Sequence, residues 1–425
     1  MYRNVINDFA AWYERGHRQI LYVKGAYGVG KTWTVTDFAT AFFTDQLYID
    51  ISDNKELIEC INSFDIDGFN SIITPMLENK DLSKTIIIFD EVQTSNDCGE
   101  FFYTFLKAHR SYTICLIAST MAITEYEYHH KDVFNIIRMR PMTFEEFLIA
   151  NKSHPLIAAI TNSKDTPIND VELEGINQML RDFLLVGGMP GIVNEFIKTK
   201  DYNLVRNKQL ELIDMYETVI RKSFSSAMSQ RCRRVWKSIP KQLIKDNKKF
   251  MYNLVDENAR SREYQEATQN LCSLGFARKL PRLKAGTLPL EDHVDYKSFQ
   301  LYIIDHGLLR ALYNLPIQEN ITLDEILSEK DGAVIEQYIF QELSNKLGNI
   351  YYWISSATAR VPFVYQGIDT PIPVDVRFKP NKKAQNIKTF CSKNPNTELS
   401  VRISQEPVSL EDNILNIPAY GLWNM

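Results

Sequence analysis

The stretch that decides the fold runs from Ile20 to Thr34 and reads ILYVKGAYGVGKTWT. An apolar run at 20–23 precedes the loop GAYGVGKT at 25–32, and a helical pattern follows that loop. A strand, a glycine-rich loop and a helix with the spacing G-x-x-x-x-G-K-[ST] are typical of a P-loop, whose backbone N–H groups converge on phosphate oxygens. We therefore predict a nucleotide-binding site at this loop.

The residue types in the loop suit this chemistry. Glycines allow the tight backbone turn that brings N–H groups together. Lys31 places a positive charge on the β- and γ-phosphates, and the hydroxyl of Thr32 can ligate Mg²⁺. The helix that follows points its positive end at the same anion. The predicted cofactors are ATP and Mg²⁺, and the loop residues predicted to hold them are Gly25, Ala26, Tyr27, Gly28, Val29, Gly30, Lys31, Thr32 and Trp33.

A second motif follows about sixty residues later, where residues 85–91 read TIIIFDE. A β-branched run that ends in two acids indicates a buried parallel strand that delivers carboxylates to the carboxyl edge of a sheet. This pattern matches a Walker B motif, in which Asp90 holds Mg²⁺ and Glu91 polarises the attacking water as the catalytic residue. The alternative is a strand that ends in a solvated Asp-Glu turn, but the preceding P-loop favours the Walker B interpretation.

Three further strands complete the predicted sheet, and the first of them is formed by residues 46–51, between the P-loop helix and the Walker B strand. Residues 112–120 form a buried strand that ends in Ser119 and Thr120, which are candidates for sensing the γ-phosphate or else mark only the end of the strand. Residues 135–141 form a strand closed by a proline. Five strands that alternate with helices predict a doubly wound α/β parallel sheet.

Composition describes a globular chain without an extreme charge. The 425 residues are 44% hydrophobic and 24% charged, carry a net charge of −5 and have room for about two to four domains. Six cysteines show no zinc-ligand spacing, which fits reduced thiols in a cytoplasmic protein. No leader pattern opens the chain and no apolar run approaches the ~20 residues of a membrane span, so we expect no membrane association.

The segments beyond the sheet differ in character. We predict a P-loop ATPase core over 1–150, a helical lid over 151–230 and a winged-helix-like module over 231–285. The stretch 231–249 contains eight Lys or Arg against one acid, Asp246. It is either a local surface that contacts nucleic acid phosphates or the solvated face of an ATPase lid, and we favour the second interpretation.

Several segments resemble those of prokaryotic AAA+-type ATPases, related to the STAND and archaeal ATPase branch, that carry a C-terminal restriction-endonuclease-like domain. The resemblance covers nearly the whole chain and implies an α/β endonuclease-like domain over 286–425. Its segments are GAYGVGKT (25–32), IIIFDE (86–91), RPMTFEEFL (140–148), GGMP (187–190), SREYQEATQNLCSLGFARKL (261–280), LYIIDHGLL (301–309) and GAVIEQYIFQEL (332–343).

The C-terminal segment departs from the family pattern, which has an acid on a helix, an E-V-D-F strand and an I-E-V-K strand. Glu336 fits the first acid, Pro362 occupies the second strand where an acid is expected, and Asp375 can replace the third acid. Arg377 replaces the lysine and cannot act as a base, and Asp369 would have to substitute for the lost ligand. We therefore expect a degenerate domain that docks or dimerises without cleaving nucleic acid. Because proline lacks a backbone donor, the strand 361–365 is predicted to lie at an edge or a bulge.

The P-loop also departs from its relatives, which often carry an arginine where this chain has Tyr27 and Gly28. An arginine finger acting in cis or from a neighbouring subunit would supplement the phosphate charge, and Arg138 and Arg140 are its candidates.

Three functions remain open at this stage. The first is an ATPase whose cycle moves an attached interaction domain, the second is a nucleotide-gated binding switch with little turnover, and the third is an ATP-regulated nuclease. Glu91 favours the first over the second, and Pro362 argues against the third. The expected partners are ATP and an unidentified protein or a second copy of the chain.

Overall fold

The computed structural model describes residues 1–16, 19–95, 98–257, 260–355, 359–378 and 385–425. It divides into two compact units. Unit 1 comprises Met1–Arg140 together with Ser273–Gly275, and unit 2 comprises Pro141–Cys272 and Phe276–Met425. The finer divisions after residues 150, 230 and 285 stay predictions.

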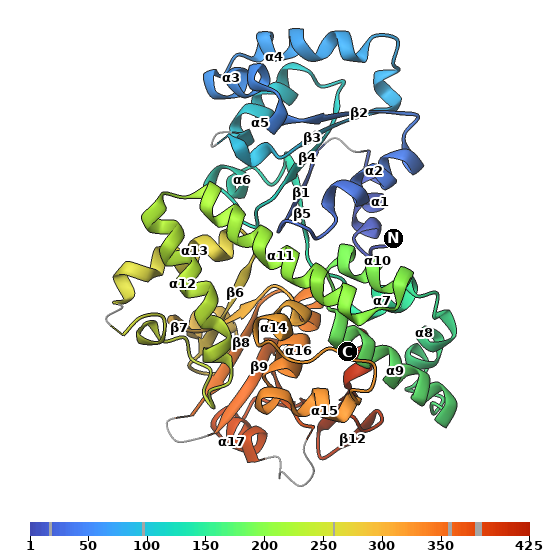
Figure 1. The fold of residues 1–425 in the computed structure, drawn as a ribbon, viewed down its shortest axis with the longest axis vertical. Helices are drawn as coiled ribbons and strands as arrows, with labels where there is room; N and C mark the ends of the chain where they lie inside the picture. Colours follow the sequence, from blue (N-terminus) through green and yellow to red (C-terminus); the bar gives the residue numbers. More distant parts are fainter. Residues whose placement is uncertain (17–18, 96–97, 258–259, 356–358, 379–384) are drawn as a thin grey trace. The chain divides into compact units, whose positions relative to one another are not determined.

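Unit 1 is built on a five-stranded parallel sheet of order β2-β3-β4-β1-β5 (Figure 1). The expected mixed α/β fold with five parallel strands is confirmed. Strand β4 lies between β1 and β3, so the carboxyl ends of these three strands are neighbours on one edge. The strands are β1 (Ile20–Gly25), β2 (Asp45–Asp50), β3 (Thr85–Asp90), β4 (Thr113–Ala118) and β5 (Phe134–Met139).

Helices cover both faces of this sheet. On one face Phe9 and Trp12 of the amphipathic N-terminal helix pack against Phe38. On the other face Phe69 packs edge-on against Phe101, within a buried aromatic cluster. The helices are α1 (Ile6–Glu14), α2 (Lys31–Phe42), α3 (Lys55–Ser63), α4 (Ile66–Ile73), α5 (Cys98–Ala108) and α6 (Glu125–His129).

Unit 2 begins with helices. Thr143 closes a capping box at the start of the first helix, because its hydroxyl accepts the N–H of Glu146 while the Glu146 carboxylate accepts the N–H of Thr143. The GGMP segment forms a junction, in which one helix ends at Val186 and the next begins at Pro190. The helices are α7 (Phe144–Ala150), α8 (His154–Thr161), α9 (Asp170–Val186), α10 (Pro190–Thr199), α11 (Tyr202–Ser223), α12 (Ser226–Leu243), α13 (Ser261–Ser273), α14 (His306–Leu312), α15 (Leu323–Ser328), α16 (Ala333–Lys346) and α17 (Gln385–Lys393).

The sheet of unit 2 is mixed and has the order β12-β13-β11-β10-β9-β8-β6-β7. The β6–β7 hairpin follows α13 as expected for a wing, but it continues into this sheet through parallel pairing of β6 with β8. The winged-helix-like module and the endonuclease-like domain stay predictions. The strands are β6 (Ala277–Leu283), β7 (Val294–Ile303), β8 (Ile350–Ile354), β9 (Arg360–Gln366), β10 (Pro371–Val376), β11 (Ser400–Ser404), β12 (Ser409–Glu411) and β13 (Ile414–Pro418).

The strand that contains Pro362 is an interior strand. Strand β9 pairs with both β8 and β10, so the edge alternative is wrong. Its register against β8 shifts between Tyr351 and Trp353, which confirms the bulge. The shift gives a proline, which cannot donate to the ladder, a place inside the sheet.

A buried acid in unit 2 generates a testable prediction. The carboxylate of Glu342 on α16 accepts the backbone N–H of Phe144 at 2.9 Å. Burial raises the pKa of Glu342 to about 8, and the charge of Glu146 adds to this effect. The pKa of Glu342 is thus higher in the folded chain than in the unfolded chain, where it is ~4.3. The protonated carboxyl group therefore stabilises the fold fully below pH ~4.3, and this contribution is lost as the pH rises through about 8.

We therefore expect the melting temperature to fall between pH 5 and pH 8 by less in Glu342→Gln than in the parent. Thermal denaturation followed by circular dichroism across this range measures the effect. Glu319→Gln, which changes an exposed carboxylate, is the matched control. Identical pH profiles for the parent and Glu342→Gln would contradict the assignment.

Candidate functional site

The P-loop occupies the turn between β1 and α2. Gly28 and Gly30 have φ angles of 85° and 88°, in the left-handed region that favours glycine. Gly25 meets a steric requirement instead, since a Cβ atom there would lie 2.6 Å from the carbonyl oxygen of Met139 on β5. Glycine is therefore required at 28 and 30 for the backbone conformation and at 25 for the close approach of β5.

Lys31, the first residue of α2, points back over its own loop. Its Nζ donates to the carbonyl oxygen of Ala26 at 3.0 Å and to the hydroxyl of Ser119 at 3.2 Å. The residue is 5% exposed, and burial lowers the pKa of Lys31 to about 8, although the charges of Glu91 and Asp90 oppose this shift. A bound phosphate would favour the charged form of this ammonium group.

Thr32 and Asp90 bring two oxygen atoms together. The Thr32 hydroxyl donates to Oδ2 of Asp90 at 2.6 Å, and the hydroxyl of Tyr48 donates to the same oxygen at 3.1 Å. A hydroxyl and a carboxylate are hard oxygen ligands that suit Mg²⁺. The described residues contain no group of three or more His, Cys, Asp or Glu side chains arranged to hold a metal. The donor set therefore fits an ion that takes its other ligands from phosphates and water.

Glu91 is held by two donors. Its backbone φ is 54°, and its carboxylate accepts the hydroxyl of Ser119 at 2.8 Å and a hydrogen bond from the Gln93 amide. Gln93 in turn accepts the backbone N–H of Ser119 at 2.9 Å. The Ser119 hydroxyl thus lies between Lys31 and Glu91.

The other predicted residues lie in different surroundings. Thr120 turns away from Lys31 and donates to the carbonyl oxygen of Ser273 at 2.7 Å. The side chains of Tyr27 and Trp33 are 40% and 50% exposed. Ala26 and Val29 are buried.

The arginine candidates differ in placement. Arg138 lies on β5 in register with Lys24, and its side chain is exposed. The carbonyl oxygen of Arg140 accepts the guanidinium of Arg3 at 2.6 Å, and Arg3 also donates to the carbonyl oxygen of Val29 at 2.7 Å. Arg3 therefore ties the N-terminal segment to the P-loop, and the identity of an arginine finger stays open.

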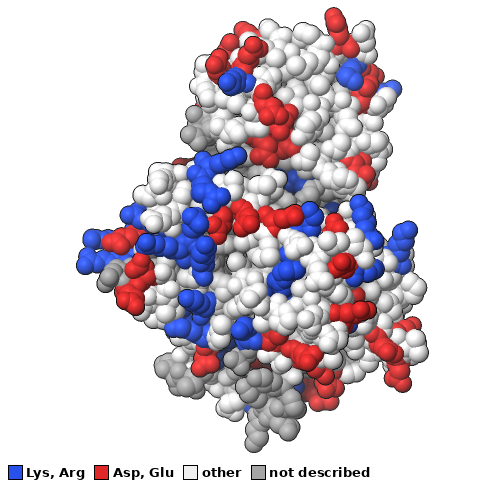
Figure 2. Space-filling view, in the orientation of Figure 1, with Lys and Arg blue, Asp and Glu red and all other residues white. Residues whose placement is uncertain are grey.

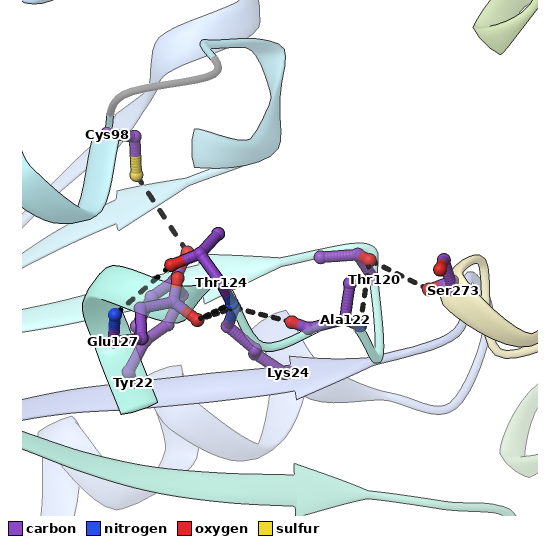
Figure 3. A network of polar contacts seen from close by, with 8 residues as sticks. All are labelled: Tyr22, Lys24, Cys98, Thr120, Ala122, Thr124, Glu127 and Ser273. Carbon is purple, nitrogen blue, oxygen red and sulfur yellow. Dashed lines mark hydrogen bonds and ion pairs between the residues drawn. The ribbon is translucent and has the colours of Figure 1, made fainter. Parts of the chain in front are cut away.

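A buried polar network supports the loop after β4 (Figure 3). Nζ of Lys24 donates to the carboxylate of Glu127 at 2.6 Å and to the carbonyl oxygen of Ala122 at 2.7 Å. Both charged side chains are 2% exposed, so the loss of either partner would leave a buried unpaired charge. Glu127 also closes a capping box with Thr124 at the start of α6.

Three of these contacts were missed from the sequence. Tyr48 stands near the end of the second strand and Gln93 stands two residues after Glu91, so closeness to a predicted motif was the available signal. Lys24 lies inside the apolar run that precedes the P-loop, where a charge in a buried parallel strand was itself a signal for a buried partner.

Comparisons with known proteins match three segments of the chain to families. Residues 17–148 match the family described as AAA domain. Residues 177–319 match a domain of unknown function (DUF8612), and residues 331–420 match another (DUF4143). A comparison with curated proteins gives no match.

Among solved structures, C. elegans PCH-2 is similar to this chain with 13% identity and a TM-score of 0.25. The match covers 39% of this chain and 49% of that chain, so it spans about half the length of its relative. No helix in the described part of the chain is long and apolar enough to cross a membrane. The AAA domain match over 17–148 supports a P-loop ATPase.

The buried Lys31 generates the second prediction. Lys31→Ala removes a charge-assisted phosphate contact and should weaken Mg²⁺·ATP binding more than about tenfold. Because the pKa of Lys31 is about 8 without nucleotide, binding at pH 8.5 should also take up protons in the parent and less so in the variant.

Calorimetry in two buffers with different ionisation enthalpies measures both quantities. Lys55→Ala, which removes an exposed lysine of α3, should leave both unchanged. Unchanged affinity in Lys31→Ala would show that the loop does not hold the phosphates.

Proposed function

We propose that the protein binds and hydrolyses ATP and that its nucleotide state controls unit 2, which serves as an interaction domain. The observation that supports hydrolysis best is the position of Glu91 at the end of β3. Its carboxylate is linked through the Ser119 hydroxyl to Lys31, the residue expected to contact the transferred phosphate. A carboxylate held at this edge can orient a water molecule for attack on the γ-phosphate.

The residues at the carboxyl edge of the parallel sheet have different proposed roles. Lys31 and the loop N–H groups bind the phosphates, and Thr32 and Asp90 would hold Mg²⁺, which neutralises charge on the phosphate oxygens. Ser119 and Gln93 position Glu91. An arginine finger from a second copy of the chain would supply further positive charge to the γ-phosphate, and the exposed Arg138 is accessible for such a role.

Segment Ser273–Gly275 supports the proposed control of unit 2. The backbone N–H of Met121 and the hydroxyl of Thr120 both donate to the carbonyl oxygen of Ser273, each at 2.7 Å. A Cβ atom on Gly275 would lie 2.7 Å from the side chain of Met121 and 3.0 Å from that of Ala26. This segment thus packs on the P-loop and on the loop after Ser119, while the chain on either side of it belongs to unit 2.

Two alternatives remain. A binding switch with little turnover is favoured by the engagement of both Glu91 oxygens with Ser119 and Gln93. A nuclease is disfavoured because Glu336 and Asp375 are each paired with arginine. Unit 2 is therefore proposed to bind a partner without cleaving phosphodiester bonds.

The test separates hydrolysis from binding. Glu91→Gln should lower turnover by roughly 10²–10⁴ while the affinity for ATP stays similar, because the lost group acts on water. Phosphate release and equilibrium binding measure the two quantities, and Glu100→Gln, an exposed change on α5, is the control. Turnover in Glu91→Gln equal to that of the parent would sink the catalytic assignment, whereas negligible turnover in the parent would favour the switch.

A further inference from the structure

Unit 2 contains a cavity of about 380 Å³, whose lining includes Glu336, Asp375 and Arg377 of the predicted endonuclease-like domain. It lies between the turn that follows α12, the N-terminus of α16 and strands β9 and β10. Small-molecule sites in proteins begin at roughly this size. The question is which ligand its charges would accept.

Three charged side chains of the cavity lining form a cluster. Oε2 of Glu336 is 2.9 Å from Nζ of Lys248 and accepts Nη2 of Arg360 at 2.7 Å, while Oε1 accepts Nη1 of Arg360 at 3.1 Å. Burial alone would raise the pKa of Glu336, but the charges of Arg360 and Lys248 lower it to about 2. Two cations therefore share one carboxylate, and the cluster keeps one positive charge in excess.

The rest of the ionisable lining is balanced, so the single excess positive charge of the cavity comes from this cluster. Arg377 donates to Asp375 at 3.0 Å, and the exposed Lys245 and Asp246 lie on the turn after α12. The ionisable lining residues are the four cations Lys245, Lys248, Arg360 and Arg377 and the three acids Asp246, Glu336 and Asp375. Both buried carboxylates already bind arginine, so a metal ion would have to displace those contacts. The cavity is built for an anion.

The N-terminus of α16 adds to the same preference. Its N-cap residue, Gly332, lines the cavity and has no side chain to cap the helix. The 14-residue helix therefore directs its positive end toward a space whose ionisable lining already carries one net positive charge. Guanidinium groups together with a helix N-terminus favour phosphate over a carboxylate of one charge.

A row of exposed cations leads to the cavity. Arg234, Lys237, Lys241 and Lys245 are spaced by three, four and four residues, so they share one face of α12 and of the turn that follows it. Figure 2 shows Lys and Arg gathered over α11 and α12. Arg234 pairs with Asp256 and Lys237 with Glu217, whereas Lys241 and Lys245 have no ion pair within the described residues. Lys245 belongs both to this row and to the cavity.

We propose that the cavity binds the terminal phosphate of a single nucleic acid strand and that the exposed face of α12 contacts the phosphates that follow. A strand end carries the extra negative charge that suits the net positive charge of the cavity lining. A cavity of this volume admits one nucleotide-sized group, so a duplex would have to fray to enter it. The α12 face binds phosphates without reading bases, so affinity should depend on salt and little on sequence.

Fluorescence anisotropy of the full-length chain without ATP tests this proposal with one short single-stranded oligonucleotide in three forms. These carry a 5′-phosphate, a 3′-phosphate or hydroxyls at both ends. One phosphorylated form should bind about tenfold tighter than the hydroxyl form, because its phosphate gains charge-assisted hydrogen bonds. The oligonucleotide should remain uncut when Mg²⁺ is present.

Three variants locate the contact. Lys245→Ala and Arg377→Gln should abolish most of the preference for the phosphorylated end. The first variant changes an exposed residue, and in the second the glutamine amide can still donate a hydrogen bond to Asp375. Lys241→Ala should instead weaken every form equally and reduce the salt dependence by about 0.7 in the log–log slope. Lys198→Ala, on the exposed face of α10, is the control.

Three results would overturn the proposal. The first is equal affinity of the parent for all three forms, and the second is a preference that survives in both Lys245→Ala and Arg377→Gln. The third is loss of the preference in Lys31→Ala, which would assign the strand end to the P-loop.

Discussion

The hydroxyl of Ser119 is the contact on which the proposed nucleotide site depends, because it accepts a hydrogen bond from Lys31 and donates one to Glu91. This shared hydrogen bond requires β4 to lie between β1 and β3, since only then do the P-loop, the acids and the serine meet at one edge. A phosphate that drew Lys31 away would remove one partner of Ser119 and alter the restraint on Glu91. Thr120 and Met121, which follow Ser119, both donate hydrogen bonds to the carbonyl oxygen of Ser273. A shift of Ser119 would therefore be passed to Ser273, whose neighbours in the sequence belong to unit 2.

Local pattern predicted most of unit 1. The order of a buried strand, a glycine-rich loop and a helix located Lys31 and Thr32, and the β-branched run located Asp90 and Glu91. Such motifs are readable because the chemistry fixes both residue type and spacing. The sequence did not reveal the hydrogen-bond partners Gln93, Tyr48 and Lys24, because a hydrogen bond between segments far apart in the chain leaves no periodic signal.

Unit 2 was less predictable for a different reason. The proline at 362 indicated an edge or a bulge, and only strand pairing could choose between them. The acids Glu336 and Asp375 stood out as remnants of a metal site, but their character depends on Arg360, Lys248 and Arg377. Charge in a cavity is the sum over several elements, so single motifs do not reveal its sign.

Hydrogen exchange of α13 measured with and without Mg²⁺·ATP tests the central claim most directly, namely that nucleotide state reaches unit 2 through Ser273. The account predicts that ATP changes exchange over residues 261–273 in the parent and in Thr104→Val, an exposed control on α5. In Thr120→Val, which loses the bond to Ser273, the change should be largely lost while ATP still binds. A nucleotide-dependent change in exchange over residues 261–273 that is as large in Thr120→Val as in the parent, or no change in the parent, would contradict the claim.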